Sequence, residues 1–313
     1  MNPTPINTRT ESRTDTRTDR RTETGSEAGT HTGTDGRADA STGDIKVRNL
    51  RFDVHLDVPR HWLGGRKSVT SFFDNLSVFF PLGERFFIQA VAAHQRFVRD
   101  PQLRKDVRAF CGQEGIHSRE HESYNDMLAH QGYPVRDMEL QVQKLLTAAA
   151  RATTKRQQLA FTCALEHFTA LMAHTALEND VFAGAHPTMG ALWKWHAVEE
   201  NEHRAVAFDV YRAAGGTYGE RVRCMVLASV IFWAKVLEHQ IRLMRCDGTV
   251  FSLREWAQLG WFLFGKPGWL RQIIPLYLHY FRPSFHPHDL DCTAAMERWK
   301  REYATSEVYR KAA

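Results

Sequence analysis

Two short stretches decide the fold of this chain: QEGIH at residues 113–117 and EENEH at residues 199–203. Each contains Glu-x-x-His within a long run of helical periodicity, so its carboxylate and imidazole project from one face of a helix. A further glutamate precedes each stretch by one helix. Glu84 lies 30 residues before Glu114, and Glu166 lies 34 residues before Glu200. The order Glu, then Glu-x-x-His, therefore occurs twice.

This repeated order predicts a two-metal carboxylate site inside a four-helix bundle. Carboxylate oxygens and imidazole nitrogens suit Fe and Mn, and a carboxylate can bridge two ions. The expected cofactor is two Fe ions, with Mn, a mixed Fe/Mn pair or Zn as alternatives. Glu114 and Glu200 are the candidates for bridging the ions in catalysis. The full set of expected ligands is Glu84, Glu114, His117, Glu166, Glu200 and His203.

Helical periodicity places these residues on four core helices, at about residues 70–99, 101–130, 154–183 and 188–214. A crossover at 135–153, with its own helix, joins the second core helix to the third, as in ferritin-like bundles. Each expected ligand interrupts an apolar stripe, where an unpaired charge is costly. We therefore predict an all-α fold with a ferritin-like bundle over residues 45–216.

Other polar residues near the two stretches have several interpretations. Glu199 and Gln113 each stand just before a Glu-x-x-His and are candidates for holding a ligand in place. His121 lies one turn beyond His117, and His196 shares a helix face with Glu200. His121 is an extra ligand, a group that orients a ligand, or a core histidine with satisfied hydrogen bonds. His196 is an extra ligand or a group that orients one. For Glu84, an ion pair with a nearby arginine is the alternative to a metal.

The two ends of the chain differ from this core. Residues 1–44 are rich in Thr, Arg, Asp, Glu and Gly, contain no aromatic residue, and are predicted to be a disordered tail. Residues 217–313 are expected to form a helical extension that packs on the bundle and ends in one helix at about 291–311. Their longest uncharged run, Cys224–Ala234, is too short to span a bilayer, so no transmembrane helix is predicted. A homodimer interface and a peripheral membrane contact are the less favoured roles of this apolar region.

Charge and cysteine usage limit the partners and the setting. The net charge is +5 and the isoelectric point is about 9.0, but the basic residues form no dense run, which argues against a nucleic-acid site. The five cysteines form no C-x-x-C pair and no disulfide framework. We therefore expect a reducing, cytoplasmic setting.

Five motifs together resemble the bacterial proteins catalogued as predicted metal-dependent hydrolases, over about residues 48–305. They are FPLGERFF at 80–87, QEGIH at 113–117, LEH at 165–167, WHAVEENEH at 195–203 and FHP at 285–287. The paired Glu-x-x-His also resembles the ferritin-like di-iron superfamily, which includes oxygenases, oxidases, desaturases and iron stores. This resemblance implies the same six ligands. It also implies an acid before each Glu-x-x-His that bonds a ligand histidine on the opposite helix. Glu199 matches that role and Gln113, an amide, departs from it, so we expect asymmetric surroundings for the two histidines.

Three functions follow from these features. The first is an oxygen-activating di-iron enzyme, supplied by an unknown electron donor, that oxidises a small and fairly apolar organic substrate. The second is a hydrolase that uses a metal-bound hydroxide, as the family description says. The third is a non-catalytic metal store or sensor. Of these we expect the first, because four carboxylates and two histidines match that chemistry.

Overall fold

The computed structural model describes residues 45–54, 57–266 and 268–313. The expected disordered tail, residues 1–44, lies outside the described residues. Within them the chain is helical, with one isolated bridge between Leu63 and Ala185 and no strand, which confirms the all-α prediction. The longer helices are α1 (Lys67–Ala92), α2 (Pro101–His130), α3 (Val135–Ala152), α4 (Lys155–Glu178), α5 (Pro187–His203), α6 (Val206–Ala213), α7 (Tyr218–Cys246), α8 (Leu253–Phe264), α9 (Trp269–His279), α10 (Thr293–Thr305) and α11 (Glu307–Ala312).

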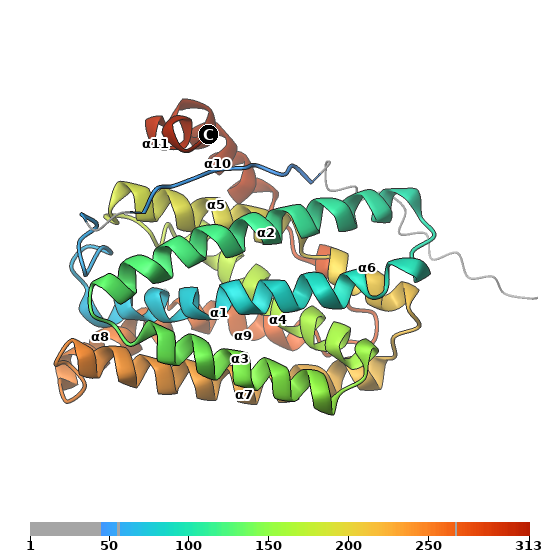
Figure 1. The fold of residues 1–313 in the computed structure, drawn as a ribbon. Coiled ribbons are helices and arrows are strands. Elements are labelled where there is room, and N and C mark those ends of the chain that lie inside the picture. Colours follow the sequence, from blue (N-terminus) through green and yellow to red (C-terminus); the bar gives the residue numbers. More distant parts are fainter. Residues whose placement is uncertain (1–44, 55–56, 267) are drawn as a thin grey trace, which may run out of the picture. The chain divides into compact units, whose positions relative to one another are not determined.

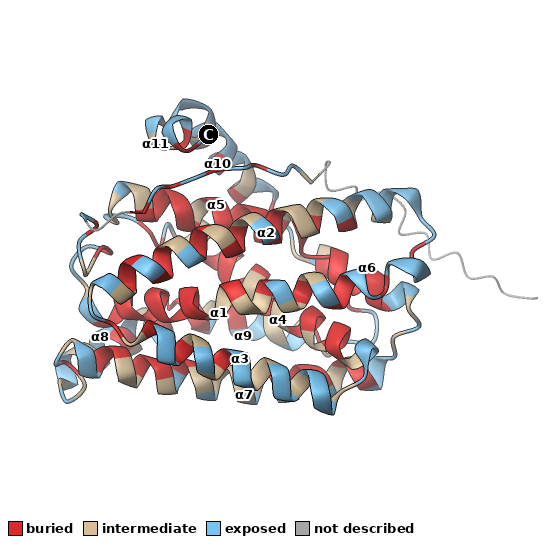
Figure 2. Cartoon of the chain, in the orientation of Figure 1, coloured by how far each residue is buried: buried red, intermediate tan, exposed pale blue. Residues whose placement is uncertain are grey.

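Helices α1, α2, α4 and α5 surround the centre of the molecule. α1 packs against α2, α4 packs against α5, and contacts of α1 with α4 and of α2 with α5 close the ring (Figure 1). Buried residues gather on the sides of these helices that face one another (Figure 2). α3 crosses outside this group and packs on α1, whereas α7 covers α1 and α4. The C-terminal helices therefore add a further layer against two of the central helices.

Local signals fix several helix ends. The Asp100 side chain accepts hydrogen bonds from two amides at the start of α2, where Pro101 occupies the first turn. α2 ends at His130 before Gly132, whose positive φ of 88° suits a residue without a Cβ atom. Thr154 and Gln157 form the capping box that the sequence predicts for α4.

Four predicted helices end or break elsewhere. The helix expected at 188–214 is divided into α5 and α6 by a turn at Arg204 and Ala205. In this turn the Arg204 side chain bonds the carbonyl of Asn201, which a continuous helix would offer to the amide of Ala205. The helix expected at 291–311 breaks at Ser306 into α10 and α11. The first and third core helices end at residues 92 and 178, earlier than predicted.

Residues 45–54, here called the N-terminal strap, have no regular structure and run along α2 and α5. The amide of Phe52 donates to Glu120 Oε2 of α2 at 2.8 Å, and the Phe52 ring lies 5.3 Å from the ring of Trp195 of α5. The amide of Arg51 donates to the carbonyl of Ala312 at 2.7 Å. The two ends of the described chain therefore hold each other against the central helices.

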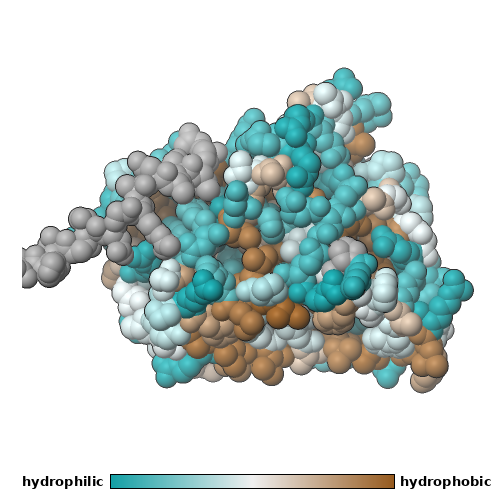
Figure 3. Space-filling view, turned by 180° about the vertical axis from the view of Figure 1, so that it is seen from behind, coloured by the Kyte–Doolittle hydropathy of each residue, from teal (hydrophilic) through white to brown (hydrophobic). Residues whose placement is uncertain are grey.

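An apolar surface lies over the C-terminal helices. Phe251, Leu253 and Trp261 are 94%, 85% and 67% exposed, and Val230 of α7 is 65% exposed. Figure 3 shows apolar side chains gathered along the lower edge of the molecule, along which α7 runs in Figure 1. The sequence predicts no transmembrane helix, but two stretches, Lys67–Phe97 and Tyr218–Cys246, are long and apolar enough to cross a membrane. The first of them is largely α1, a central helix of the fold.

Candidate metal centre

The six expected ligands meet in one buried cluster between the central helices. α1 supplies Glu84, α4 supplies Glu166, and α2 and α5 each supply a Glu and a His. None of the six is more than 4% exposed. On one side of the cluster, His203 Nε2 lies 3.0 Å from Glu114 Oε1 and 3.5 Å from Glu166 Oε2. Among the residues that the structure describes, no arginine forms an ion pair with Glu84, and the neighbouring Arg85 pairs with Glu122.

The other side of the cluster contains a further histidine. His196 Nε2 lies 3.0 Å from Glu200 Oε1 and 3.9 Å from Glu84 Oε1, and His117 Nδ1 lies 3.7 Å from Glu200 Oε1. Glu200 Oε1 is also 3.7 Å from His203 Nε2, so this carboxylate lies between the two sides. Three sets of donor atoms, each with all members within 4.8 Å of one another, could hold an ion: Glu84, His117 and His196; Glu114, Glu166 and His203; and Glu114, His117 and Glu200.

Unpartnered polar atoms show that these residues fit a metal. Eight buried atoms of the six expected ligands have no hydrogen-bond partner among the described residues, and every one of the six contributes at least one. The short approach of His203 to Glu114 is an ion-pair contact without hydrogen-bond alignment. Buried polar atoms are normally paired, and several oxygens and nitrogens left unpaired at one place are the donor set of a cation. The atoms are Glu84 Oε1, Glu114 Oε1 and Oε2, His117 Nδ1, Glu166 Oε1 and Oε2, Glu200 Oε2 and His203 Nε2.

The two Glu-x-x-His histidines are each held from the opposite helix. His203 Nδ1 lies 2.9 Å from Gln113 Oε1, which can only accept, so Nδ1 carries a proton and Nε2 faces the carboxylates. His117 Nε2 lies 3.1 Å from Glu199 Oε2, which leaves Nδ1 of His117 facing the cluster. Gln113 thus occupies the same position as Glu199, although it is neutral. The expected asymmetry is one of charge and not of position.

An arginine that the sequence did not single out completes these contacts. Arg48 of the N-terminal strap donates to Glu199 Oε1 at 2.9 Å and to Glu202 Oε1 at 2.7 Å, and it is 7% exposed. Gln113 Nε2 donates to Glu202 Oε2 at 2.9 Å, so the same network reaches both ligand histidines. Arg48 stands in a segment without helical periodicity, and nothing in its local sequence indicates this role.

A chain of hydrogen bonds fixes the direction of His196. Ser77 Oγ donates to Asn125 Oδ1 at 2.8 Å, so it accepts from His121 Nδ1, which lies 2.9 Å away. His121 is buried and touches no carboxylate, so it is neutral and its Nε2 accepts from His196 Nδ1 at 2.7 Å. His196 Nε2 then faces Glu200 Oε1 at 3.0 Å, within hydrogen-bond distance. Because this nitrogen faces the cluster, His196 is a candidate ligand and His121 orients it.

Crowding of the carboxylates shifts their protonation in the absence of metal. Burial, followed by the charge of Glu166, raises the pKa of Glu114 from 4.5 to about 8. Burial also raises the pKa of Glu166 to about 7. Burial alone would raise the pKa of Glu200 as well, but His203 and His196 more than offset it and hold that pKa well below 4.5. Glu200 is therefore the carboxylate that stays ionised among the imidazoles.

We expect the metal-free protein to lose stability as the pH rises from about 7 to about 8.5. The raised pKa values of Glu114 and Glu166 mean that the folded chain binds more protons than the unfolded chain in this range. His203 acts in the same direction, because Glu114 and Glu200 outweigh the effect of burial and hold its pKa well above 6.5. Burial lowers the pKa values of His117 and His121, and these shifts affect the stability of the fold only below about pH 6.5.

Thermal unfolding of chelator-treated protein at the two pH values measures this effect. The melting temperature should be lower at the higher pH, and added Mn²⁺ should remove the difference because it neutralises the carboxylates. The Glu114→Gln variant should show a weaker pH dependence, whereas Glu122→Gln, at an exposed position of the same helix, should behave as the parent does. A metal-free melting temperature that rises over this range contradicts the protonation scheme.

The fold and the cluster define an all-helical protein with buried glutamates and histidines that could bind a divalent metal. The chain belongs to the family described as predicted metal-dependent hydrolases, because the model of that family matches residues 46–291. The matched region contains the six expected ligands, the network of Arg48 and the chain through His196. The comparisons with curated proteins and with solved structures gave no match.

Proposed function

We propose that the protein is a hydrolase that holds two divalent metal ions in this cluster. The observation that carries the proposal is the convergence of eight unpartnered donor atoms from the six expected ligands, in a chain that belongs to a metal-dependent hydrolase family. Four ionised glutamates and two neutral histidines also balance the charge of two divalent ions. Bound ions would lower the pKa of a water molecule and polarise the carbonyl or phosphoryl oxygen of a substrate.

The residues around the ligands have two tasks in this proposal. Gln113 and Glu199 hold the rings of His203 and His117 so that one nitrogen of each faces the cluster. Such orienting contacts strengthen metal binding. The second task is to keep bulk water out. The rings of Phe110 and Trp195 lie 5.0 Å and 4.8 Å from those of the two ligand histidines, and both rings are buried.

The test combines metal analysis with hydrolysis assays. Protein purified without chelators should contain two divalent ions per chain. Protein loaded with Mn²⁺ or Zn²⁺ should hydrolyse carboxylic or phosphoric esters without oxygen, and the Glu166→Gln variant should lose this activity. The control is His167→Ala, because His167 is a buried histidine of the same helix whose ring packs against that of Tyr280, with the ring centroids 5.0 Å apart. Metal-loaded protein that turns over no ester, amide or phosphoester would rule the hydrolase out.

Oxygen activation is the second candidate, and the ligand set is the observation that favours it. Two-metal hydrolases more often use His and Asp, whereas four glutamates with paired Glu-x-x-His are typical of ferritin-like di-iron proteins. The family match gives this chemistry no support and favours hydrolysis. Oxygen consumption on addition of Fe(II), with the appearance of oxo-bridged ferric absorption, would support it. Metal binding without either activity would indicate a store or sensor.

We also retain the cytoplasmic setting as part of the proposal. All five cysteines are free, including Cys163 and Cys292 in the interior. Thiols of this kind persist where the surroundings are reducing. Fractionation of cells that express the full chain, with detection in the soluble cytosolic fraction, is the corresponding measurement.

A further inference from the structure

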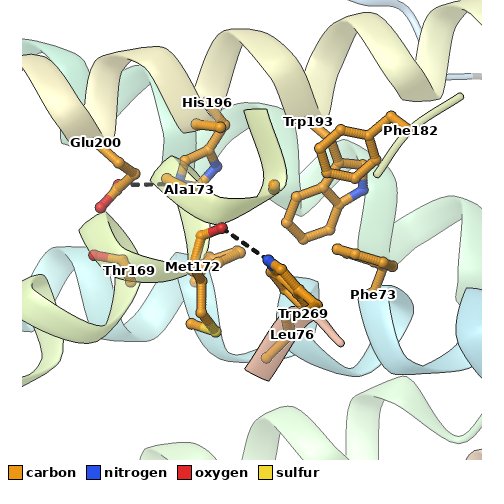
Figure 4. A pocket seen from close by; sticks show the side chains of 13 residues that line it. Phe73, Leu76, Thr169, Met172, Ala173, Phe182, Trp193, His196, Glu200 and Trp269 are labelled. Carbon is orange, nitrogen blue, oxygen red and sulfur yellow. Dashed lines mark hydrogen bonds and ion pairs between the residues drawn. The ribbon is translucent and has the colours of Figure 1, made fainter. Parts of the chain in front are cut away.

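A narrow apolar cavity of about 30 Å³ adjoins the metal centre. Glu200 and His196 line one end of it, and the indole of Trp269, at the start of α9, lines its wall beyond Met172 (Figure 4). Its walls come from α1, α4 and α5 and from the loop after α4. The wall residues that matter below are Phe73, Leu76, Met172, Ala173, Ala176 and Phe182.

The walls offer a ligand almost nothing but hydrocarbon. Thr169 also lines the cavity, and its hydroxyl already donates to the carbonyl of Glu166 at 3.0 Å. The remaining polar atoms of the lining side chains are the indole nitrogens of Trp193 and Trp269. The ionisable groups, Glu200 and His196, lie at the end next to the candidate ligands. An apolar cavity that meets a polar reactive centre suits a molecule with an apolar tail and a polar reacting group.

Trp269 forms a fixed part of the cavity wall. Its Nε1 donates to the carbonyl of Met172 at 3.2 Å, and its ring stacks on Phe73 with a centroid distance of 5.2 Å. The side chain is 4% exposed. Trp269 also lines a surface pocket of about 440 Å³, together with Val181, Trp261 and Phe262. Trp269 thus lines both a small inner cavity and a much larger outer pocket.

We propose, on the basis of the hydrolase function above, that the substrate is an ester with a short, unbranched acyl chain. Its chain lies in the inner cavity, its carbonyl lies at Glu200 and His196, and Trp269 sets the upper limit of chain length. A space of about 30 Å³ holds about two to three non-hydrogen atoms, since one water-sized probe needs roughly 10–15 Å³. The acyl group therefore has about two to four carbons, the carbonyl carbon included.

The reaction is the addition of water across the acyl–oxygen bond of the ester. The bond between the carbonyl carbon and the alcohol oxygen breaks, and a bond from that carbon to the water oxygen forms. One water proton goes to the departing alcohol oxygen. The products are a short-chain carboxylic acid and an alcohol, and no oxidant or reductant is needed.

Chain-length profiles of the metal-loaded full chain test the proposal. The substrates are p-nitrophenyl acetate, butyrate, hexanoate and octanoate. We expect kcat/KM to be highest for acetate and butyrate. It should fall by roughly tenfold or more at each longer ester, because the acyl chain then exceeds the cavity. Ala173→Val narrows the cavity and should lower kcat/KM for butyrate about tenfold while acetate is retained. Trp269→Phe should move the optimum to hexanoate. Trp261→Ala, which alters only the outer pocket, is the matched control and should leave the profile unchanged.

A binding readout separates this inference from the proposed function. Butyrate should quench the tryptophan fluorescence of metal-loaded protein, through Trp193 and Trp269, more effectively than octanoate does. The Ala173→Val variant should bind butyrate about tenfold more weakly with unchanged metal content. If this discrimination is found but no ester is turned over, the hydrolase proposal fails and the acyl cavity stands. The proposal of an acyl cavity is overturned if Ala173→Val and Trp269→Phe both leave the chain-length profile of kcat/KM and the relative binding of butyrate and octanoate unchanged.

Discussion

Replacing Glu114 with glutamine, or His203 with alanine, is expected to reduce bound metal from two ions per chain to one or none. His203 Nε2 lies 3.0 Å from Glu114 Oε1, and both Glu114 oxygens lack a hydrogen-bond partner. Removing a residue that only orients a ligand weakens metal binding roughly 10- to 100-fold. Loss of the Glu114 carboxylate or of the His203 imidazole, which are ligands themselves, should weaken it further. Helix content should persist, because neither residue is needed to cap or start a helix.

The same Glu114→Gln variant should make the metal-free fold more stable at pH 8. Burial and Glu166 raise the pKa of Glu114 to about 8, so ionisation of this carboxyl near that pH is unfavourable in the folded chain. Elemental analysis and thermal unfolding of chelator-treated samples measure the two effects. The controls are His167→Ala and Glu122→Gln. Two bound ions in both Glu114→Gln and His203→Ala would refute the cluster as a metal site.

The free energy of unfolding of the Arg48→Ala variant should be lower by about 3–5 kcal/mol, the range found when one partner of a buried ion pair is removed. The Arg48 side chain is 6% exposed, and its loss leaves Glu199 (0% exposed) and Glu202 (11% exposed) without their cation. Metal binding should also weaken by about 10- to 100-fold, because Glu199 would no longer be held against His117.

Urea unfolding and metal titration of Arg48→Ala test both parts. Arg51→Ala is the matched control, because Arg51 belongs to the same strap but its side chain is exposed. The free energy of unfolding of Arg51→Ala is expected to stay within about 0.5 kcal/mol of the parent value. Equal stability of the two variants would show that the strap does not support the cluster. Metal affinity equal to that of the parent would show that Glu199 keeps its position without Arg48.

The sequence predicted the parts of this protein that depend on local order. Glu-x-x-His places two side chains on one helix face whatever surrounds the helix, so residues 114–117 and 200–203 could be read as pairs. The capping residues Thr154 and Asp100 likewise act on amides within three positions of themselves. The apolar stripes then indicated which face of each helix is buried, and so predicted that the six glutamates and histidines meet.

Features that depend on contacts between distant segments could not be predicted in this way. Arg48 and Glu199 are 151 positions apart, and the break after α5 arises where Arg204 also bonds the backbone of Pro287. The resemblance to di-iron proteins marked Gln113 as a departure, and only the folded chain shows its amide oxygen opposite His203. Neither the helical period of apolar residues nor the spacing of motifs along the sequence predicts these contacts, because they join elements whose relative positions are set by packing.

The helices, the two ligand motifs and the burial of their carboxylates were thus determined by the sequence alone, through helix geometry and the cost of an unpaired buried charge. The tertiary structure decided how the site is completed. It turns Nε2 of His196 toward Glu200 through Ser77 and His121, and it places Trp269 in the wall of the cavity. Both outcomes follow from the packing of helices against one another, because hydrogen-bond direction and cavity length exist only once those helices are in contact.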